Sequence, residues 1–141
     1  MNIKIKLFEN GKMPEYKTKG ASCADCYVRL DKPFIVLKPF EKIIVPLGFG
    51  LELPDGYEAV IRPRSGISKE ILSIIGTIDS DYRGEINVML YNYSDRDVIV
   101  YDGNRVCQIK IQKSEQFNFE IVDELSITER NDNGFGSTGV N

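Results

Sequence analysis

Short apolar runs, some alternating with polar residues, recur along the chain and are separated by glycine and proline. Ile3, Ile5 and Leu7 alternate with polar residues, which is the period-2 pattern of a half-buried strand. Similar runs predict strands at Phe34 to Leu37, Lys42 to Pro46, Phe49 to Leu53, Tyr57 to Arg62, Ile86 to Tyr91, Val98 to Tyr101, Val106 to Ile111, and through Phe117, Phe119 and Ile121. Because many short strands with this punctuation are typical of sandwiches and barrels, we predict an all-β fold, a jelly-roll or β-barrel-like sandwich.

One segment has a pattern that favours a helix. Ile67 to Leu72 would form barely two turns, which is marginal for a helix in water. Pro54-Asp55-Gly56 is a strong turn signal, and the sequence contains no internal repeat or domain linker. We therefore expect a single folded domain over residues 1–126, followed by a flexible tail over residues 127–141.

The tail is rich in glycine and contains nothing around which a core could form, so it is free to be disordered. It also carries groups suited to a nucleotide. Glycines such as Gly136 let main-chain N–H groups approach phosphates, and Ser137 and Thr138 add hydroxyl donors. Arg130 supplies positive charge, and Phe135 offers a flat face for stacking on a base. Glycine-rich tails are mostly inert, so this reading depends on the rest of the chain.

Composition and charge narrow the classes of partner. At 141 residues, with 42% hydrophobic and 28% charged residues, the chain is long enough for one globular domain with a real core. A net charge of −3 argues against tracking a nucleic-acid backbone, because that affinity depends on a surplus of Lys and Arg. No apolar run approaches the length of a membrane span, and the N-terminus lacks a signal-peptide core. We expect a cytoplasmic protein without membrane contacts.

The chain has three cysteines and no histidine. Without histidine, the usual general base and most zinc chemistry are excluded, so catalysis would run on carboxylates with a hard cation as helper. Cys23 and Cys26 form a C-x-x-C, but in an extended segment residues three apart point to opposite faces. Cys107 is the remaining cysteine, so we interpret all three as small buried residues rather than metal ligands.

The densest chemistry lies between Gly76 and Ile86. Asp79, Asp81, Tyr82 and Arg83 follow one another closely there, directly before a predicted strand. Asp, Ser and Gly are ordinary turn formers, but a simple turn does not need a tyrosine and an arginine beside its acids. Ionisable and aromatic residues clustered on a loop between rigid elements indicate a functional site.

Several segments in one order carry a resemblance to a known family. They are Asp25, Pro63-Arg64-Ser65-Gly66, Gly76 to Gly84, Gly103 to Gln108, and Arg130 with Gly134 to Gly139. With this set the chain resembles the trimeric deoxyuridine triphosphatase (dUTPase) family over nearly its whole length. The resemblance implies a jelly-roll subunit, a homotrimer, and three sites at subunit interfaces that each draw on all three chains. It implies hydrolysis of dUTP to dUMP and pyrophosphate with Mg²⁺, which limits uracil incorporation into DNA and supplies dUMP for dTMP synthesis.

The resemblance also implies roles for residues on the central stretch. Asp79 would activate the water that attacks the α-phosphorus, which fits the absence of histidine. Tyr82 would lie against the deoxyribose and exclude a 2′-hydroxyl. The hairpin from Ser73 to Asp79, with Gly76 and Ile78, would read uracil largely through main-chain groups. Asp81 and Glu85 would serve only turn and trimer-interface electrostatics.

The remaining implied roles concern the phosphates and the metal. Ser65, Gly66 and Gln108 would hold the phosphate chain, while Arg64 and Arg105 would either touch phosphate or brace the site. Arg130 would pair with the γ-phosphate, Phe135 would stack over uracil, and Ser137 and Thr138 would bind the outer phosphates. Gly136 would also contact the substrate. Asp25 would lie near the metal-bound triphosphate, through water.

Some positions depart from the family pattern. The first motif usually reads Ala-Gly-Tyr-Asp-Leu, whereas here the acid lies in Cys23-Ala24-Asp25-Cys26. Ser73 falls where an asparagine often helps to read the base, so this chain departs from the family in the side-chain part of uracil recognition and not in the main-chain part. Asn131 and Asn133 replace two glycines, which should stiffen the tail.

Two other functions are compatible with the same scaffold. The dCTP deaminases place a catalytic glutamate where this chain has Met89, and methionine cannot transfer protons, so deamination is disfavoured. The other alternative is a non-catalytic nucleotide sensor or protein-binding module. The joint presence of Asp79, Tyr82 and Phe135 favours an enzyme over this alternative.

Overall fold

The structure, a computed structural model, describes residues 2–132 and contains strands but no helix in that range. The strands are β1 (Lys4–Leu7), β2 (Ala24–Tyr27), β3 (Phe34–Leu37), β4 (Lys42–Pro46), β5 (Phe49–Glu52), β6 (Tyr57–Arg62), β7 (Ile71–Ser73), β8 (Gly76–Ile78), β9 (Asn87–Asn92), β10 (Val98–Tyr101) and β11 (Arg105–Lys113). Most strands predicted from the hydrophobic pattern are confirmed, several of them with the same bounds, such as β3, β4 and β6.

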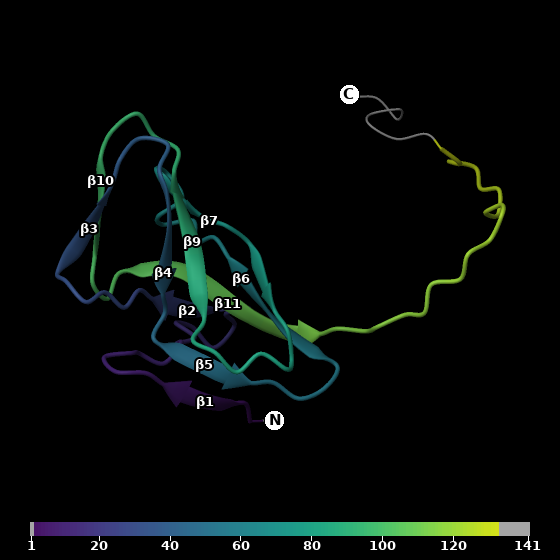
Figure 1. Cartoon of the computed structure of the whole chain (residues 1–141), viewed down its shortest axis with the longest axis horizontal. Helices are drawn as coiled ribbons and strands as arrows, with labels where there is room; N and C mark the ends of the chain where they lie inside the picture. Colours follow the sequence, from purple (N-terminus) through teal and green to yellow (C-terminus); the bar gives the residue numbers. More distant parts are fainter. Residues whose placement is uncertain (1, 133–141) are drawn as a thin grey trace.

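The strands form four small antiparallel sheets that wrap around one core (Figure 1). A four-stranded sheet has the order β2-β11-β6-β8, and a three-stranded sheet has the order β4-β9-β7. Two pairs, β1–β5 and β3–β10, complete the body. Because most pairings join strands that are not consecutive in sequence, the chain crosses repeatedly between layers, as a jelly roll does.

Alternation along the strands decides which side chains enter the core. In β3, Ile35 and Leu37 are buried while Phe34 and Val36 are exposed, so one face of the strand packs inward. Large aliphatic and aromatic residues from several sheets meet in a single cluster, which includes Phe49, Ile61 and Leu90. Within residues 2–132 every buried side-chain nitrogen or oxygen has a hydrogen-bond partner, as expected of a well-packed domain.

The helix predicted from Ile67 to Leu72 is wrong. Residues 65–70 form hydrogen-bonded turns, in which the Ile67 amide donates to the Arg64 carbonyl at 3.3 Å. The chain then enters β7, where Leu72 pairs with Tyr91 of β9. A two-turn helix has few internal hydrogen bonds. Pairing with β9 is therefore more favourable than a helix for the second half of the segment.

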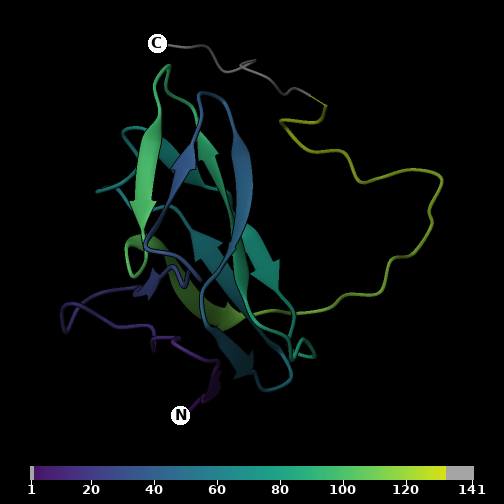
Figure 2. The ribbon, with the colours of Figure 1, turned by 60° about the vertical axis from the view of Figure 1, so that its left-hand side comes forward.

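The strand predicted through Phe117, Phe119 and Ile121 is also wrong for the single chain. The last strand, β11, ends at Lys113, and the following segment leaves the body without pairing with any strand in the described residues (Figures 1 and 2). Phe117, Phe119 and Ile121 are 73%, 99% and 99% exposed. The alternation is present in the sequence, but the segment has no partner strand among residues 2–132.

The hairpin implied between Ser73 and Asp79 takes a different form. β7 and β8 both exist, yet β7 pairs with β9 and β8 pairs with β6, so the two strands belong to different sheets. The Ile74 amide still donates to the Met89 carbonyl at 2.8 Å, and the chain crosses between the sheets at residues 74–75. The segment is therefore a link between two layers rather than a paired hairpin.

Candidate active site

A small cavity lies where β8 ends and the Asp79 loop begins. It has a volume of about 260 Å³ and is lined by Thr77, Ile78, Asp79, Tyr82, Ile86 and Asn87. β8 is held against β6 by the pairs Ala59 with Ile78 and Ile61 with Gly76, so one wall rests on the four-stranded sheet. Gly76 and Ile78, both expected at the base, stand at or beside this wall. The structure thus brings Asp79 and Tyr82 to one hollow.

The loop from Asp79 to Glu85 folds into a tight turn that exposes its chemistry. The Tyr82 amide donates to the Asp79 carbonyl at 3.2 Å, and Arg83 donates to the Ser80 carbonyl. The Asp79 side chain is exposed and has no ion pair or hydrogen bond within residues 2–132. An unpaired carboxylate at the rim of a cavity is available to accept a proton.

The ring of Tyr82 folds back over Gly84 and stays partly exposed. Its hydroxyl donates to the Glu85 carbonyl at 2.9 Å. A Cβ at Gly84 would lie 2.3 Å from the Tyr82 hydroxyl oxygen and 2.6 Å from the ring, so this position accommodates only glycine with the ring in place. The glycine of the Tyr-Arg-Gly sequence therefore has a specific packing reason.

The Glu85 side chain anchors the end of this loop, which the sequence reasoning missed. Its carboxylate accepts hydrogen bonds from Arg29 at 3.0 and 3.2 Å and from the Gly48 amide at 3.0 Å. The pairing with Glu85 raises the pKa of the Arg29 guanidinium further. Arg29 and Glu85 are far apart in sequence and belong to no shared motif, so only their opposite charges could have hinted at the pair.

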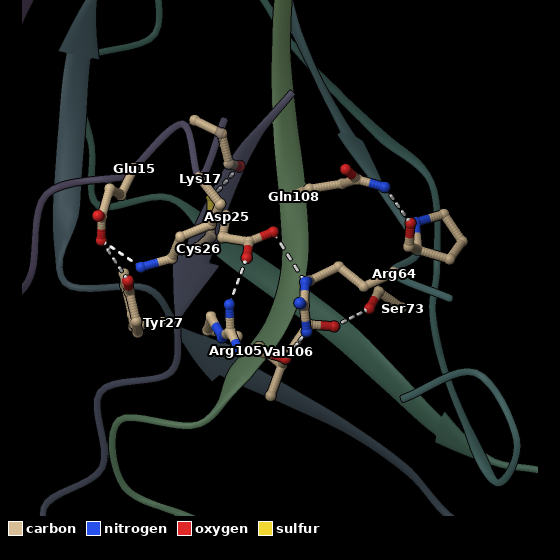
Figure 3. Close-up of polar contacts among 12 residues, drawn as sticks. Glu15, Lys17, Asp25, Cys26, Tyr27, Arg64, Ser73, Arg105, Val106 and Gln108 are labelled. Carbon is tan, nitrogen blue, oxygen red and sulfur yellow. Dashed lines mark hydrogen bonds and ion pairs between the residues drawn. The ribbon is translucent and has the colours of Figure 1, made fainter. Parts of the chain in front are cut away.

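Asp25 of β2 lies between two arginines, Arg64 just after the end of β6 and Arg105 at the start of β11 (Figure 3). One carboxylate oxygen accepts from Arg64 Nε at 2.8 Å and the other from Arg105 at 3.0 Å. Arg64 also donates to the Arg105 carbonyl at 3.1 Å. Of the two expected roles for these arginines, bracing is realised in this geometry, and a contact of either with phosphate stays a prediction.

The residues expected to hold the phosphates lie near this arginine cluster. Gln108 of β11 pairs with Asp25 of β2 and donates through its amide to the Pro63 carbonyl at 2.7 Å. Ser65 and Gly66 follow Pro63 on the exposed turn, where the Ser65 carbonyl accepts from the Ser68 hydroxyl. Gln108 therefore fixes the start of the turn that presents Ser65 and Gly66.

The two halves of the expected site lie apart within one chain. Gln108 is opposite Arg62 in the β6–β11 ladder, whereas Ile78 is opposite Ala59 in the β6–β8 ladder. Arg62 and Ala59 are three residues apart, which is roughly 10 Å along a strand, and Asp79 lies beyond Ile78. Within one chain, Asp79 and Tyr82 therefore lie together near the start of β6. Ser65 and Gln108 lie together near its end.

Ser73 is placed differently from the expectation. It is 2% exposed, and its hydroxyl donates to the Val106 carbonyl (Figure 3). The hydroxyl is thus committed to the interior. A contribution of Ser73 to base recognition would have to come from its main chain.

The tail residues are only partly described. Arg130 is exposed and belongs to the segment after β11, which runs away from the strands (Figure 1). Phe135, Gly136, Ser137 and Thr138 lie outside the described residues. Their roles stay predictions.

The described residues do not form a resident metal site. No group of three or more Cys, Asp or Glu side chains close enough to hold a metal occurs within residues 2–132. Both oxygens of Asp25 already bind guanidinium groups, so the donor set around this residue does not fit a directly bound cation. A metal carried mainly by substrate phosphates and water is the arrangement compatible with these residues.

A second hollow adjoins Asp79 and is strongly acidic. It has a volume of about 610 Å³, and its lining includes Asp55, Glu58, Asp79 and Asp81. We call this space the acidic hollow. Four carboxylates repel phosphate groups, so phosphates would bind here only together with cations that compensate the negative charge.

Two of the three cysteines are buried, as expected, and the third is partly exposed. Cys26 and Cys107 are opposite one another on β2 and β11, both 0% exposed, while Cys23 is intermediate. The neighbouring Cys107 thiol and burial both raise the pKa of the Cys26 thiol, which therefore stays protonated and unreactive. Within residues 2–132 no helix is long and apolar enough to cross a membrane.

Comparisons with known proteins agree with this fold. A family model described as dUTPase matches residues 9–139. The chain is 42% identical to the deoxyuridine 5'-triphosphate nucleotidohydrolase of Finegoldia magna, with 99% of both chains covered. It is 46% identical to the protein of that name from Hydrogenobaculum sp., with 96% of this chain and 95% of the relative covered.

Solved structures of dUTPases share the fold. The Staphylococcus bacteriophage 80alpha dUTPase with dUPNHPP has a TM-score of 0.89 and 25% identity, with 99% of each chain covered. A dUTPase from phage phi11 of S. aureus, studied for the coordination of a structural Mg(II) ion, has a TM-score of 0.80. It is 20% identical over 90% of this chain and 100% of that one, which concerns the fold alone. From the family match and the full-length relatives, the chain belongs to the dUTPase family.

Proposed function

We propose that this protein hydrolyses dUTP to dUMP and pyrophosphate. The observation that carries the proposal is the cavity that unites Asp79 and Tyr82 on a loop held by β8. Full-length relatives are named deoxyuridine 5'-triphosphate nucleotidohydrolases, and a structural neighbour was solved with dUPNHPP.

Asp79 acts as the general base in this proposal. Its carboxylate is exposed and unpaired within residues 2–132, and the chain contains no histidine that could take the role. Asp79 accepts a proton from water as the water oxygen forms a bond to the α-phosphorus. The bond from that phosphorus to the bridging oxygen breaks, and pyrophosphate leaves with the bonding electron pair.

Tyr82 selects the sugar. Its ring lines the cavity and is tied down through its hydroxyl, so it presents a fixed flat surface. Against such a surface a 2′-hydroxyl has no room and no partner, which disfavours UTP. Main-chain groups of the β7–β8 link read the uracil.

Other copies of the chain complete the site. Ser65, Gly66 and Gln108 lie at the far end of β6 from Asp79, so we assign the phosphate contacts at one site to a different subunit. Arg130, Phe135, Ser137 and Thr138 would come from a third, through a tail that leaves the body after β11. The proposed assembly is a homotrimer in which residues 127–141 close a neighbouring site. Closed symmetric assemblies of this kind are common among soluble oligomers.

Mg²⁺ would enter with the triphosphate. The acidic hollow beside Asp79 repels phosphates, whereas a magnesium–triphosphate complex brings its own compensating charge. When bound, the ion neutralises phosphate charge and orients the reacting group. Asp25 contacts it at most through water, because its oxygens bind Arg64 and Arg105. In the cell this reaction would limit uracil incorporation into DNA and supply dUMP for dTMP synthesis.

The test is pyrophosphate release from dUTP with Mg²⁺, compared with dCTP, dTTP and UTP. Asp79→Asn should lower kcat for dUTP by roughly 10²- to 10⁴-fold, the usual contribution of a general base. Asp81→Asn is the matched control, since it neutralises an acid on the same loop that has no proposed catalytic role. Absence of release by the parent protein would refute the enzyme proposal, and full turnover by Asp79→Asn would refute the assigned base.

A further inference from the structure

We propose that Arg29, acting through Glu85, is a positioning residue for Tyr82 and thereby sets the discrimination between dUTP and UTP. This inference rests on the proposed function, because it needs Tyr82 to face the sugar. Arg29 lies on the segment after β2, outside the segments that carry the family resemblance. It touches neither the cavity nor Tyr82, so its effect must pass through Glu85.

The Arg29–Glu85 pair is well built. Nε and Nη2 of Arg29 donate to the two carboxylate oxygens of Glu85 at 3.0 and 3.2 Å, a bidentate arrangement that fixes the orientation of the carboxylate. The Gly48 amide adds a third hydrogen bond at 3.0 Å. The two side chains are only 19% and 21% exposed. Partial burial and three donors distinguish this pair from ordinary surface ion pairs, which contribute little.

The Arg29 backbone is itself held by the rest of the fold. Its amide donates to the Pro46 carbonyl at 2.9 Å, and the next amide, of Leu30, donates to the Asp102 carboxylate at 2.9 Å. Gly48 has a φ of +76°, and a Cβ there would lie 2.5 Å from the Gly11 Cα and 3.3 Å from Arg29. The Arg29 side chain therefore extends from a backbone that hydrogen bonds hold in place. It passes along Gly48, where the absence of a side chain leaves room for it.

The other side of Glu85 faces the cavity. While its carboxylate is held by Arg29, its carbonyl accepts from the Tyr82 hydroxyl at 2.9 Å and from the Asn87 amide at 3.0 Å. Tyr82 and Asn87 both line the cavity. Glu85 thus links the partly buried ion pair to two residues that line the proposed sugar site. The position of the Glu85 carbonyl sets the position of the Tyr82 ring.

A purely structural pair would affect stability but not selectivity. If Glu85 is released, its carbonyl can shift and the Tyr82 ring loses its single hydrogen-bonded anchor. A ring that can move leaves room for a 2′-hydroxyl. The kcat/KM for UTP should therefore rise relative to the kcat/KM for dUTP. The quantity that reports positioning is therefore the ratio of kcat/KM for dUTP to kcat/KM for UTP.

The experiment compares Arg29→Gln, Arg29→Lys and Tyr82→Phe in the full-length protein. Arg29→Gln and Tyr82→Phe should each lower the dUTP-to-UTP ratio by roughly tenfold, the effect of losing one oriented hydrogen bond. Arg29→Lys should recover part of the loss, because lysine keeps the charge but cannot make the bidentate contact. Lys38→Gln is the control, since it removes an exposed ion pair with Asp97 on the β3–β10 pair. Its ratio should equal that of the parent.

A double-mutant cycle tests whether Arg29 acts through the tyrosine hydroxyl. If it does, Arg29→Gln should change the ratio by less than about twofold in the Tyr82→Phe background. Additive losses in the double variant, or an unchanged ratio in Arg29→Gln, would overturn the proposal. If Arg29→Gln does not fold, Arg29→Lys takes its place in the comparison and in the cycle. An unchanged ratio in Arg29→Lys, additive losses with Tyr82→Phe, or an unchanged ratio in Tyr82→Phe would each overturn the proposal.

The outcome separates this inference from the proposed function. A parent protein that hydrolyses dUTP and UTP equally well would refute the role of Tyr82 as the sugar selector. A parent that strongly prefers dUTP, together with Arg29 variants that keep that preference, would refute only the positioning role of Arg29.

Discussion

At the scale of single residues, Asp25 shows how a residue with an expected site role also holds the fold together. It is 8% exposed and sits on β2, with Arg64 and Arg105 on its two oxygens. A carboxylate between two guanidinium groups neutralises positive charge that would otherwise repel across the sheet. Asp25 and the two arginines lie beside Gln108 and the Ser65 turn. Both guanidinium groups are therefore close to the residues proposed to contact the phosphates.

Replacing Asp25 by Asn should therefore lower the free energy of unfolding by about 2–3 kcal/mol, since it leaves two partly buried cations without their counter-charge. The measurement is urea denaturation of the two proteins at the same concentration. Asp95→Asn, at an exposed acid without an ion pair in the described chain, is the control and should change stability little. Equal stability of Asp25→Asn and the parent would contradict the bracing role.

At the scale of elements, most of the strands predicted from the hydrophobic pattern find a partner strand within the same chain. Lys42–Pro46 and Tyr57–Arg62 are apolar runs that pair with β9 and β11, so the predicted strands and the observed pairing agree. The prediction of a short helix was wrong because Ile71–Ser73 pairs with β9. The local sequence gives no sign of this long-range contact.

The site was predictable to a similar extent. Asp79 and Tyr82 are neighbours in sequence, and their meeting at one cavity follows from a short loop. The Arg29–Glu85 pair depends on how β2 and β9 pack, which no local pattern encodes.

The segment through Phe119 and Ile121 is the clearest case of an element without a partner in its own chain. Both residues are 99% exposed, and in the proposed trimer a neighbouring subunit would cover these alternating apolar residues. Phe119→Asp together with Ile121→Asp should therefore weaken association and release monomers. Sedimentation velocity would measure this, with Glu120→Gln on the same segment as the control. A doubly substituted protein that stays trimeric would contradict the docking of this segment on a neighbour.

At the scale of the whole molecule, the separation of the two half-sites along β6 is the decisive feature. Asp79 and Tyr82 lie beyond one end of the ladder, and Gln108 with the Ser65 turn lies at the other. The C-terminal segment runs away from both (Figure 1). No single chain, as described over residues 2–132, assembles base, sugar and phosphate contacts in one place, so activity should belong to the assembly.

Complementation between two inactive variants tests this claim most directly. One variant carries Asp79→Asn with a complete tail, and the other keeps Asp79 but ends at Thr128. Each alone should form trimers with almost no release of pyrophosphate from dUTP. When the two are unfolded together and refolded as an equal mixture, random trimers should regain about a quarter of the parent activity, because one chain supplies Asp79 and a neighbour supplies the tail. If the mixture stays as inactive as its components although mixed trimers form, the site is not shared between subunits in this way.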